Sequence, residues 1–438
     1  MRLGRAQRAA RLMLATADGA TLQSTRPSEA ISGRLPMIAP LIIVLVGCIF
    51  LQRFAMPMKG GAFGLSFAIG LSVAAWGLMR GFFVIEPARF VLFIITVAAI
   101  LLTRAVSDQP FSKLSLLMLL ALYAPFVLIM PLSHGAYRRL LLAYQTIAAV
   151  IAGCGLVQFA VQFIAGPAWM FPFDRLLPAA LFVPDFNLVI EMGNGITKST
   201  GLWLLEPSVL SQLMAIAILI ELLWFCRPTM LALFSTGLIL AFSGTGLLLL
   251  AALLPAVLIA RGLLRWLIVP VLAVISAVWL LADTFPVSFF VGRLGEFGNT
   301  QSSGSMRFLG PFWASFDLFP GRPDLLVSGF GPGAAFDAVA HLDYSAHDAS
   351  WFKLLVEYGL IGALPFAVFY GYCLFAGSPD RLLSTAFLFV VLFLGGYLLG
   401  FYLQFLILAL LVWPRPVSSA PMPLADIKTT DTPHAQRC

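Results

Sequence analysis

The chain has 438 residues, of which 60% are hydrophobic and only 11% are charged, and its formal net charge at pH 7 is +7. Its mean hydropathy of +0.96 is far above that of an ordinary soluble domain, which excludes a soluble globular enzyme. The composition predicts an all-α polytopic membrane protein. We attribute most of the positive charge to membrane topology and expect no nucleic-acid partner.

Both ends of the chain are polar. No compact apolar run with a small-residue cleavage site follows the early arginines, so we expect no removable signal peptide. We predict a basic cytoplasmic tail over residues 1–35, with a short amphipathic helix on anionic lipid over 2–14 as the alternative. Residues 414–438 are rich in Pro, Ser and Thr, which predicts a disordered cytoplasmic tail.

Between the tails, residues 36–413 divide into apolar runs separated by polar segments. A membrane span needs roughly 20 mostly apolar residues, so we expect about 12 transmembrane helices in this domain. The last two are open to the alternative of one long helix broken near Gly395, Gly396 and Gly400. The expected spans cover residues 36–52, 61–79, 87–103, 114–132, 140–165, 203–225, 229–242, 246–260, 266–284, 354–375, 382–398 and 399–413.

The distribution of Lys and Arg indicates the orientation of the spans. With the amino terminus inside, most of these residues fall on inner segments, so the positive-inside rule favours cytoplasmic termini. This orientation places two long polar segments, 166–202 and 285–353, on the outer, periplasmic face. We find no internal repeat, which weakens the alternative of a secondary transporter.

The first outer segment ends in the stretch KSTGLWLLEPSVLSQ, which begins at Lys198. Pro207 suits the first turn of a helix and Gly201 a tight bend, so we expect Lys198 just before a helix that enters the membrane. Two interpretations stay open: an anion site where Lys198 and helix amides meet a phosphate, or an interfacial lysine that extends to lipid headgroups. Glu206 is expected to cap the helix or to pair with Lys198.

A second motif, FSGTGLLLL, predicts a tight turn between two helices at residues 243–246. The second outer segment then combines arginines with the glycine-rich stretch GFGPG at 329–333. No strand, crossover helix or following lysine frames GFGPG, so we interpret it as a loop that bends closely around a neighbour and not as a nucleotide-binding motif. Arg293 and Arg307 are candidates for phosphate binding, because the planar guanidinium binds phosphate oxygens bidentately.

The stretch HDASWFKLLVEYGLIG begins at His347 and leads into an apolar helix. We expect Asp348 to cap this helix, and Ser350, Lys353 and Glu357 to form one polar stripe along it, with Lys353 paired to Glu357. His347 would then lie just outside the helix, near the water interface. It is a candidate general base, with Asp348 orienting its neighbours; a merely solvated loop histidine is the alternative.

We expect neither a metal nor a cofactor. A metal site would use His341, Asp343 and His347, but their spacing matches no familiar metal site. The five cysteines lie far apart with no CxxC pair, so they indicate neither a disulfide framework nor a zinc site.

Taken in order, KSTGLWLLEPSVLSQ, FSGTGLLLL, SMRFLGPFWASFDLFPGRPDLLVSGFGPG and HDASWFKLLVEYGLIGALPF resemble the bacterial O-antigen ligase and Wzy-type polymerase superfamily. The resemblance is clearest over residues 195–375. It implies a GT-C-like bundle in the bacterial inner membrane, with a metal-independent glycosyltransferase activity on the periplasmic side. The donor would be an undecaprenyl-diphosphate-linked oligosaccharide, with membrane lipid around the protein.

The resemblance also implies roles for single residues. His347 matches the family's catalytic histidine, and Arg307 and Lys198 match positions thought to hold the diphosphate. Two residues depart from the family pattern: Asp348 stands where asparagine usually follows the histidine, and Lys198 replaces a commoner arginine and so loses the bidentate grip.

The resulting functional prediction is a polymerase that joins lipid-linked repeat units into an exopolysaccharide or O-antigen. A flippase and a chain-length co-polymerase are the partners that the resemblance suggests. The nearest alternative is an O-antigen ligase that transfers glycan to lipid A core. An alternative from another class is a flippase or transporter of lipid-linked glycans.

Overall fold

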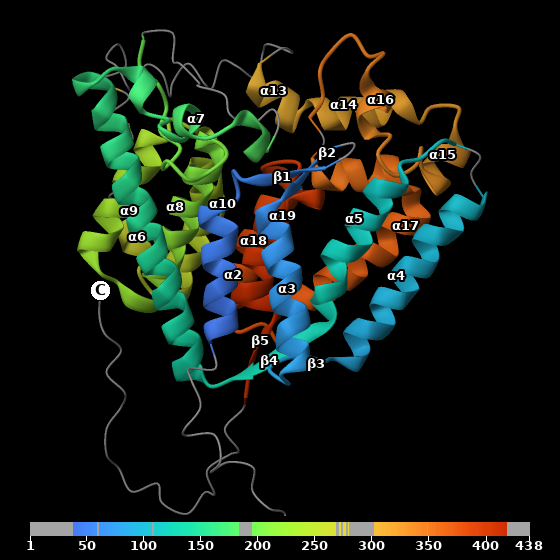
Figure 1. Ribbon diagram of the computed structural model, residues 1–438, viewed down its shortest axis with the longest axis horizontal. Coiled ribbons are helices and arrows are strands. Elements are labelled where there is room, and N and C mark those ends of the chain that lie inside the picture. The colour runs from blue at the N-terminus through green and yellow to red at the C-terminus, as the bar shows by residue number, and fades with distance from the viewer. Residues whose placement is uncertain are drawn as a thin grey trace, which may run out of the picture. The chain divides into compact units, whose positions relative to one another are not determined.

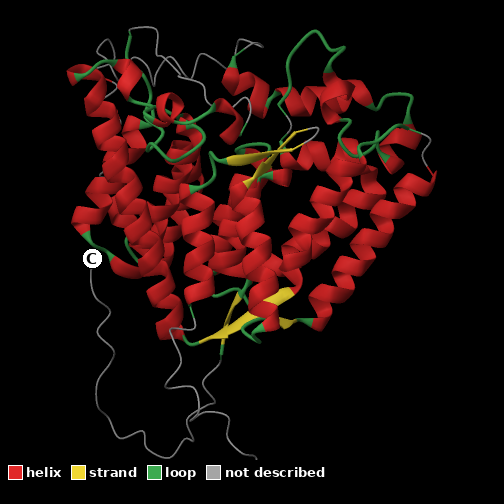
Figure 2. Cartoon of the chain, viewed as in Figure 1, coloured by secondary structure: helices red, strands yellow, loops and turns green. Residues whose placement is uncertain are grey.

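The computed structural model describes residues 38–58, 61–106, 109–183, 195–268, 271–272, 275–276, 279, 302–347 and 349–417. The tail 1–35, Arg293, Asp348 and residues 418–438 lie outside the described residues. From Pro40 onward the chain belongs to one unit, and Figures 1 and 2 show that its described part is mostly helical.

Four helices among the described residues are long and apolar enough to cross a membrane. They are α4 (Pro87–Val106), α6 (His134–Ile164), α8 (Pro207–Ile220) with its π-helical continuation η4 (Glu221–Phe225), and α17 (Ser350–Phe375). The protein is therefore a helical membrane protein, as its composition predicts.

We expect about 12 spans, some of them short, whereas only four helices among the described residues are long enough to cross a membrane. Seven of the expected spans correspond to shorter apolar helices, and span 266–284 lies largely outside the described residues. The shorter helices are α2 (Ala39–Phe50), α3 (Leu65–Met79), α5 (Lys113–Tyr123) followed by η1 (Ala124–Val127), α9 (Pro228–Leu240), α10 (Gly244–Ala260), α18 (Arg381–Phe393), and α19 (Phe401–Ile407) followed by the π-helix η8 (Leu408–Val412).

The reason for the difference is visible at residues 114–132, where hydropathy predicts one span. Pro125 lies at the start of the 3₁₀ turn η1, and Pro131 lies within the strand β4 (Leu128–Leu132), so the apolar run changes conformation twice. Hydropathy counts apolar side chains irrespective of the backbone conformation. The expected break of the last two spans is present, because the 3₁₀ turn η7 (Tyr397–Leu399) separates α18 from α19.

Two small sheets lie at opposite ends of the helices (Figure 2). At one end, β1 (Ala55–Met58) and β2 (Gly61–Gly64) form an antiparallel hairpin. At the other end, β4 pairs antiparallel with β3 (Val84–Ile85) and parallel with β5 (Pro414–Pro416). The first residues of the predicted carboxy-terminal tail thus form a strand.

A buried arginine joins the elements near the second sheet. Arg89 of α4 is only 1% exposed, and its guanidinium donates to the carbonyl oxygens of Leu128, Val412, Cys373 and Ala376 at 3.2, 2.8, 3.4 and 3.4 Å. These carbonyl groups belong to β4, to η8 and to the end of α17. One side chain therefore joins α4 to three segments that are distant from it in sequence.

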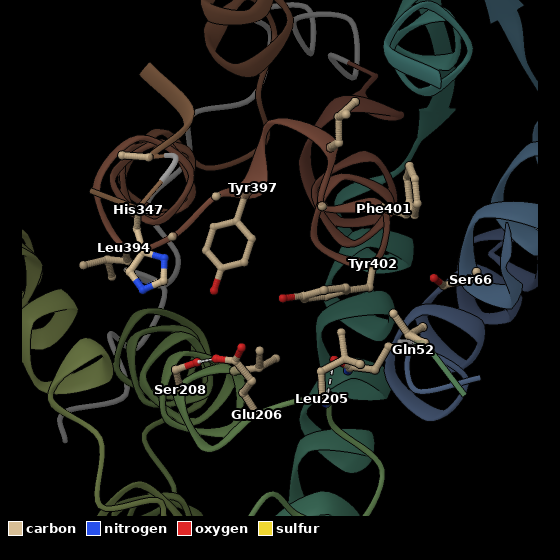
Figure 3. Close-up of a pocket in the computed structure, with 18 of the residues that line it drawn as sticks. Gln52, Ser66, Leu205, Glu206, Ser208, His347, Leu394, Tyr397, Phe401 and Tyr402 are labelled. Atoms are coloured by element: carbon tan, nitrogen blue, oxygen red, sulfur yellow. Dashed lines mark hydrogen bonds between the residues drawn. The ribbon is translucent and has the colours of Figure 1, made fainter. Parts of the chain in front are cut away.

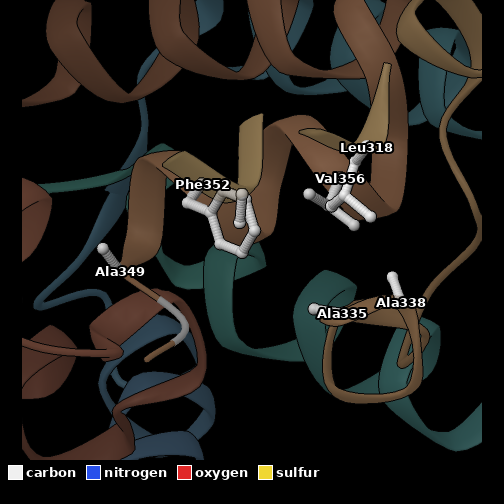
Figure 4. Packing of buried hydrophobic residues seen from close by; sticks show 7 residues of the cluster. Leu318, Ala335, Ala338, Ala349, Phe352 and Val356 are labelled. Atoms are coloured by element: carbon white, nitrogen blue, oxygen red, sulfur yellow. The ribbon is translucent and has the colours of Figure 1, made fainter. Parts of the chain in front are cut away.

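Short helices cover the end of the bundle that carries the β1–β2 hairpin (Figure 1). They are α13 (Ser303–Phe308), α14 (Gly310–Leu318), α15 (Pro323–Ser328) and α16 (Ala335–Val339). Leu318, Ala335 and Ala338 from these helices pack against Phe352 and Val356 of α17 (Figure 4). Burial of this apolar cluster fixes the short helices on the start of α17. The remaining short elements are η2 (Pro167–Trp169), α7 (Phe173–Leu176), η3 (Ala179–Leu181) and η5 (Leu264–Leu267).

Helix α17 is interrupted at Gly359, whose φ of 57° and ψ of −171° are not helical. The backbone N–H groups of Phe330 and Gly331 donate to the carbonyl oxygens of Val356 and Glu357, at 2.7 and 3.0 Å. The GFGPG loop thus satisfies carbonyl groups that the interruption leaves without helical partners. As predicted, this loop bends closely around a neighbour, and the neighbour is α17.

Candidate functional site

A cavity of about 330 Å³ lies where α18 and α19 are separated, at the end of the bundle with the short helices. Its walls come from segments far apart in sequence: the start of α8, α13, the residues before α17, the turn between α18 and α19, and the region of β2 and α3. In Figure 3, His347, Glu206, Tyr397 and Tyr402 point into one common space. Two of the predicted site residues, His347 and Arg307, line this cavity.

His347 is held by its backbone while its ring faces the cavity (Figure 3). Its N–H donates to the carbonyl oxygen of Met306 at 2.9 Å, and its own carbonyl oxygen accepts from the N–H of Ala349 at 2.9 Å. Met306 directly precedes Arg307 in α13. A hydrogen bond therefore connects the segment that carries the histidine to the helix that carries the arginine.

A second contact fixes the residues that lead to His347. Tyr344 donates its hydroxyl to Asp317 of α14 at 2.5 Å. Partial burial, and then the nearby Asp317 carboxylate, raise the pKa of Tyr344 above its ordinary value. The hydroxyl therefore stays protonated near neutral pH and continues to donate this bond.

Arg307 forms an ion pair across the cavity wall. Its Nη2 lies 3.5 Å from Oε2 of Glu206, and the two side chains are 26% and 30% exposed. At the start of α13, the Ser302 hydroxyl caps the helix by accepting from the N–H of Ser305 at 3.1 Å. Arg307 thus projects from the last turn of a capped helix toward a carboxylate on α8.

Glu206 occupies the N-cap position of α8, directly before Pro207. Its Oε2 also accepts from the Ser208 hydroxyl at 2.7 Å. The main chain of Ser208 is held in turn, because its carbonyl oxygen accepts from the Thr245 hydroxyl at 3.3 Å. Glu206 therefore occupies the N-cap position without the expected capping bond from its side chain, and it forms an ion pair with Arg307.

The SGTG turn supports the start of α8. The N–H of Gly246 donates to the Ser211 hydroxyl at 3.0 Å, and that hydroxyl donates to the carbonyl oxygen of Ser243 at 3.1 Å. A Cβ at position 246 would lie 2.3 Å from the carbonyl oxygen of Ser211. The turn predicted at 243–246 is therefore placed differently: the connection between α9 and α10 covers residues 241–243, and residues 244–246 begin α10, which packs closely on the helix that follows Glu206.

The turn between α18 and α19 supplies the opposite wall of the cavity. Tyr397 donates its hydroxyl to Gln212 of α8 at 2.7 Å, and Gln212 donates to the carbonyl oxygen of Leu394 at 3.3 Å. Gln404 donates to the carbonyl oxygen of Tyr397 at 2.9 Å. These bonds hold the non-helical turn against α8.

Gln52 and Ser66 add polar groups on the side of the amino-terminal helices, and Phe401 packs on Phe67 with ring centroids 4.6 Å apart. Gln52 accepts from the N–H of Leu205 at 3.3 Å. Sequence reasoning missed these residues, together with Tyr397 and Tyr402. The glycines at 395, 396 and 400 predicted a break between two helices. They did not indicate which side chains the break would place in the cavity wall.

Lys198, a predicted diphosphate ligand, lies outside the cavity lining. It is 8% exposed, and it is not among the described residues that line the cavity. The N–H groups of its neighbours Thr197 and Thr200 donate to Gln162 and Gln158 of α6, at 2.8 and 2.9 Å. The structure therefore does not bring Lys198 into the cavity with His347 and Arg307.

Lys353 and Glu357 form the predicted pair, with 3.5 Å between Nζ and Oε1. Neither is among the described residues that line the cavity, and Glu357 is fully buried. Ser350 donates to the carbonyl oxygen of Gly395 at 3.4 Å, which links the start of α17 to the turn before α19. The N-cap position of α17 is occupied by Ala349 and not by the predicted Asp348, which lies outside the described residues.

The cavity combines the imidazole of His347, the guanidinium of Arg307 and the carboxylate of Glu206 with several hydroxyl and amide groups. This set can bind an anion beside a polar, hydroxyl-bearing molecule and move a proton between the two. Within the described residues, no group of three or more His, Cys, Asp or Glu side chains is arranged to hold a metal ion. No protein-family model matches the chain, and no curated protein matches it.

Proposed function

We propose that this protein is a polysaccharide polymerase that joins undecaprenyl-diphosphate-linked repeat units on the periplasmic face of the bacterial inner membrane. The observation that carries the proposal is the cavity that His347 and Arg307 share, with their segments joined by the bond from His347 to Met306. The ordered motifs, which resemble those of the O-antigen ligase and Wzy-type polymerase superfamily, supply the reaction class.

In the proposed reaction, His347 removes the proton from a hydroxyl group of the acceptor sugar. The acceptor oxygen then forms a bond to the anomeric carbon of the donor glycan. The bond between that carbon and the diphosphate oxygen breaks, and the diphosphate leaves with the electron pair. Arg307 stabilises the charge that develops on the leaving group, so the diphosphate needs no further activation.

Binding of both substrates at one membrane surface supplies much of the required orientation. Among the described residues we assign diphosphate binding to Arg307, because Lys198 does not line the cavity. Arg293 remains a predicted phosphate ligand outside the described residues. The proposal retains about 12 membrane-crossing segments, some of them shorter than a full span, with both termini in the cytoplasm.

Reconstitution tests the proposal directly. Purified full-length protein in lipid vesicles, supplied with a defined undecaprenyl-diphosphate-linked repeat, is expected to form longer glycans and to release undecaprenyl diphosphate. The variant His347→Ala is expected to form none while it still inserts in the membrane. Movement of the lipid-linked repeat across the vesicle membrane, with no new glycosidic bond, would support the transporter alternative.

A gene deletion distinguishes the polymerase from the ligase. Loss of a polymerase leaves single repeats attached to the cell-surface acceptor, whereas loss of a ligase leaves long chains on the carrier lipid. Gel analysis of surface glycans separates these two outcomes. Unchanged surface glycans in the deletion strain would overturn both.

A further inference from the structure

The ion pair between Glu206 and Arg307 places a carboxylate where the proposed function requires an anionic substrate. The two residues lie 101 positions apart in sequence, on α8 and α13, and their closest charged atoms are 3.5 Å apart. A carboxylate and a diphosphate present similar pairs of oxygen atoms to a guanidinium. Oε2 of Glu206 thus lies on the guanidinium that the proposed function assigns to the diphosphate.

Glu206 has a second partner besides Arg307. Its Oε2 accepts from Ser208 at 2.7 Å, and the start of α8 is supported by the SGTG turn. Its side chain bonds to no described backbone amide of α8. With 26% and 30% of the two side chains exposed, the pair is of the weak, exchangeable kind.

We propose that Glu206 is a positioning residue that holds Arg307 before the donor binds and yields it to the diphosphate of the donor. The released carboxylate then accepts a hydrogen bond from a hydroxyl group of the acceptor sugar. This inference rests on the proposed function. It implies an order of binding, because Glu206 becomes available to the acceptor only after the donor has engaged Arg307.

Binding of a soluble prenyl diphosphate tests the first half of this exchange. Farnesyl diphosphate is titrated by calorimetry into the purified full-length protein in detergent, for the wild type, E206Q, R307Q and the double variant. Removal of the competing carboxylate is expected to tighten binding by roughly two- to fivefold, the range for a partly exposed ion pair. R307Q weakens binding, and the double variant binds like R307Q, because Glu206 acts through Arg307.

The second half of the exchange, in which Glu206 accepts a hydrogen bond from the acceptor sugar, predicts that E206Q binds the acceptor more weakly. In the reconstituted polymerase, E206Q is expected to raise the KM for the acceptor roughly tenfold or more, as loss of a charged hydrogen-bond acceptor would. A merely structural role would weaken both substrates together. Asp324→Asn, an exposed carboxylate on α15 that is not among the described cavity residues, is the matched control and should change neither value.

The outcomes separate this inference from the proposed function. If the wild type binds farnesyl diphosphate but E206Q binds it equally or more weakly, Glu206 does not compete for Arg307 and the inference is wrong. If the wild type neither binds the diphosphate nor elongates glycans, the proposed function itself fails. Should E206Q unfold in detergent, E206D provides the same test, because its shorter side chain withdraws the carboxylate from Arg307.

Discussion

The backbone N–H of His347 donates to the carbonyl oxygen of Met306 at 2.9 Å, one residue before Arg307. One hydrogen bond therefore joins the segments that carry the proposed base and the proposed diphosphate ligand, although the two residues lie 40 positions apart in sequence.

Replacing His347 with alanine is expected to lower the rate of glycan elongation by about 100-fold or more, because a positioned general base typically contributes 10²- to 10⁴-fold. The KM for the donor should change little, since Arg307 is untouched. His341→Ala is the matched control, because His341 is exposed and is not among the described cavity residues. Elongation at the wild-type rate by His347→Ala, measured in vesicles, would remove His347 from the mechanism.

Gly246→Ala should destabilise the protein and impair activity. The added Cβ would lie 2.3 Å from the carbonyl oxygen of Ser211, so the SGTG turn must move away from α8. We expect a loss of about 1–3 kcal/mol, as in other overpacked sites. Gly244→Ala is the control, because no described atom lies within 4 Å of its Cβ position. Thermal unfolding in detergent measures the difference, and equal melting temperatures for the two variants would contradict this packing argument.

Gly359→Ala should disturb the docking of the GFGPG loop. Its φ of 57° is in the left-handed region, and a Cβ would lie 2.3 Å from the carbonyl oxygen of Val327. The expected result is a lower melting temperature and faster exchange of the amide hydrogens of Phe330 and Gly331. Gly371→Ala in the same helix, where no described atom approaches the Cβ position within 4 Å, should leave both measurements unchanged. Unaltered exchange in Gly359→Ala would show that the loop does not depend on this interruption.

Arg89→Ala is expected to destabilise the fold by several kcal/mol, on the order of 2–4, because buried carbonyl groups lose a charged donor. Arg80→Ala, which changes an exposed arginine at the C-cap of α3, should be close to neutral. Chemical unfolding in mixed micelles compares the two variants. The bridging role assigned to Arg89 would be wrong if both variants unfolded at the same denaturant concentration.

Local features of this chain could be predicted from the sequence because their causes are local. The pairing of Lys353 with Glu357 follows from their four-residue spacing on one helix, and the close approach of GFGPG follows from glycines that admit backbone contact. The break at Gly395 and Gly396 follows from low helix propensity.

Features that depend on distant segments could not be predicted in this way. Nothing near Glu206 indicates that Arg307, and not Lys198, is its partner, because that choice depends on how α8 and α13 pack. Hydropathy likewise predicted a span at 114–132, although Pro125 and Pro131 divert the chain into a turn and a strand. The sequence predicts Tyr397 and Tyr402 as residues of apolar helices, whereas in the structure they line the cavity at the turn between α18 and α19.

Arg89 lies beside the β3–β5 sheet, whereas the cavity lies at the end of the helices that carries the β1–β2 hairpin (Figure 2). Sequence changes near Arg89 should therefore alter how many intact molecules a cell retains, while those near His347 alter how fast each molecule turns over. Comparing the abundance of a variant in the membrane with its specific activity distinguishes the two. A natural variant with low abundance in the membrane but normal specific activity is expected to carry its change near Arg89.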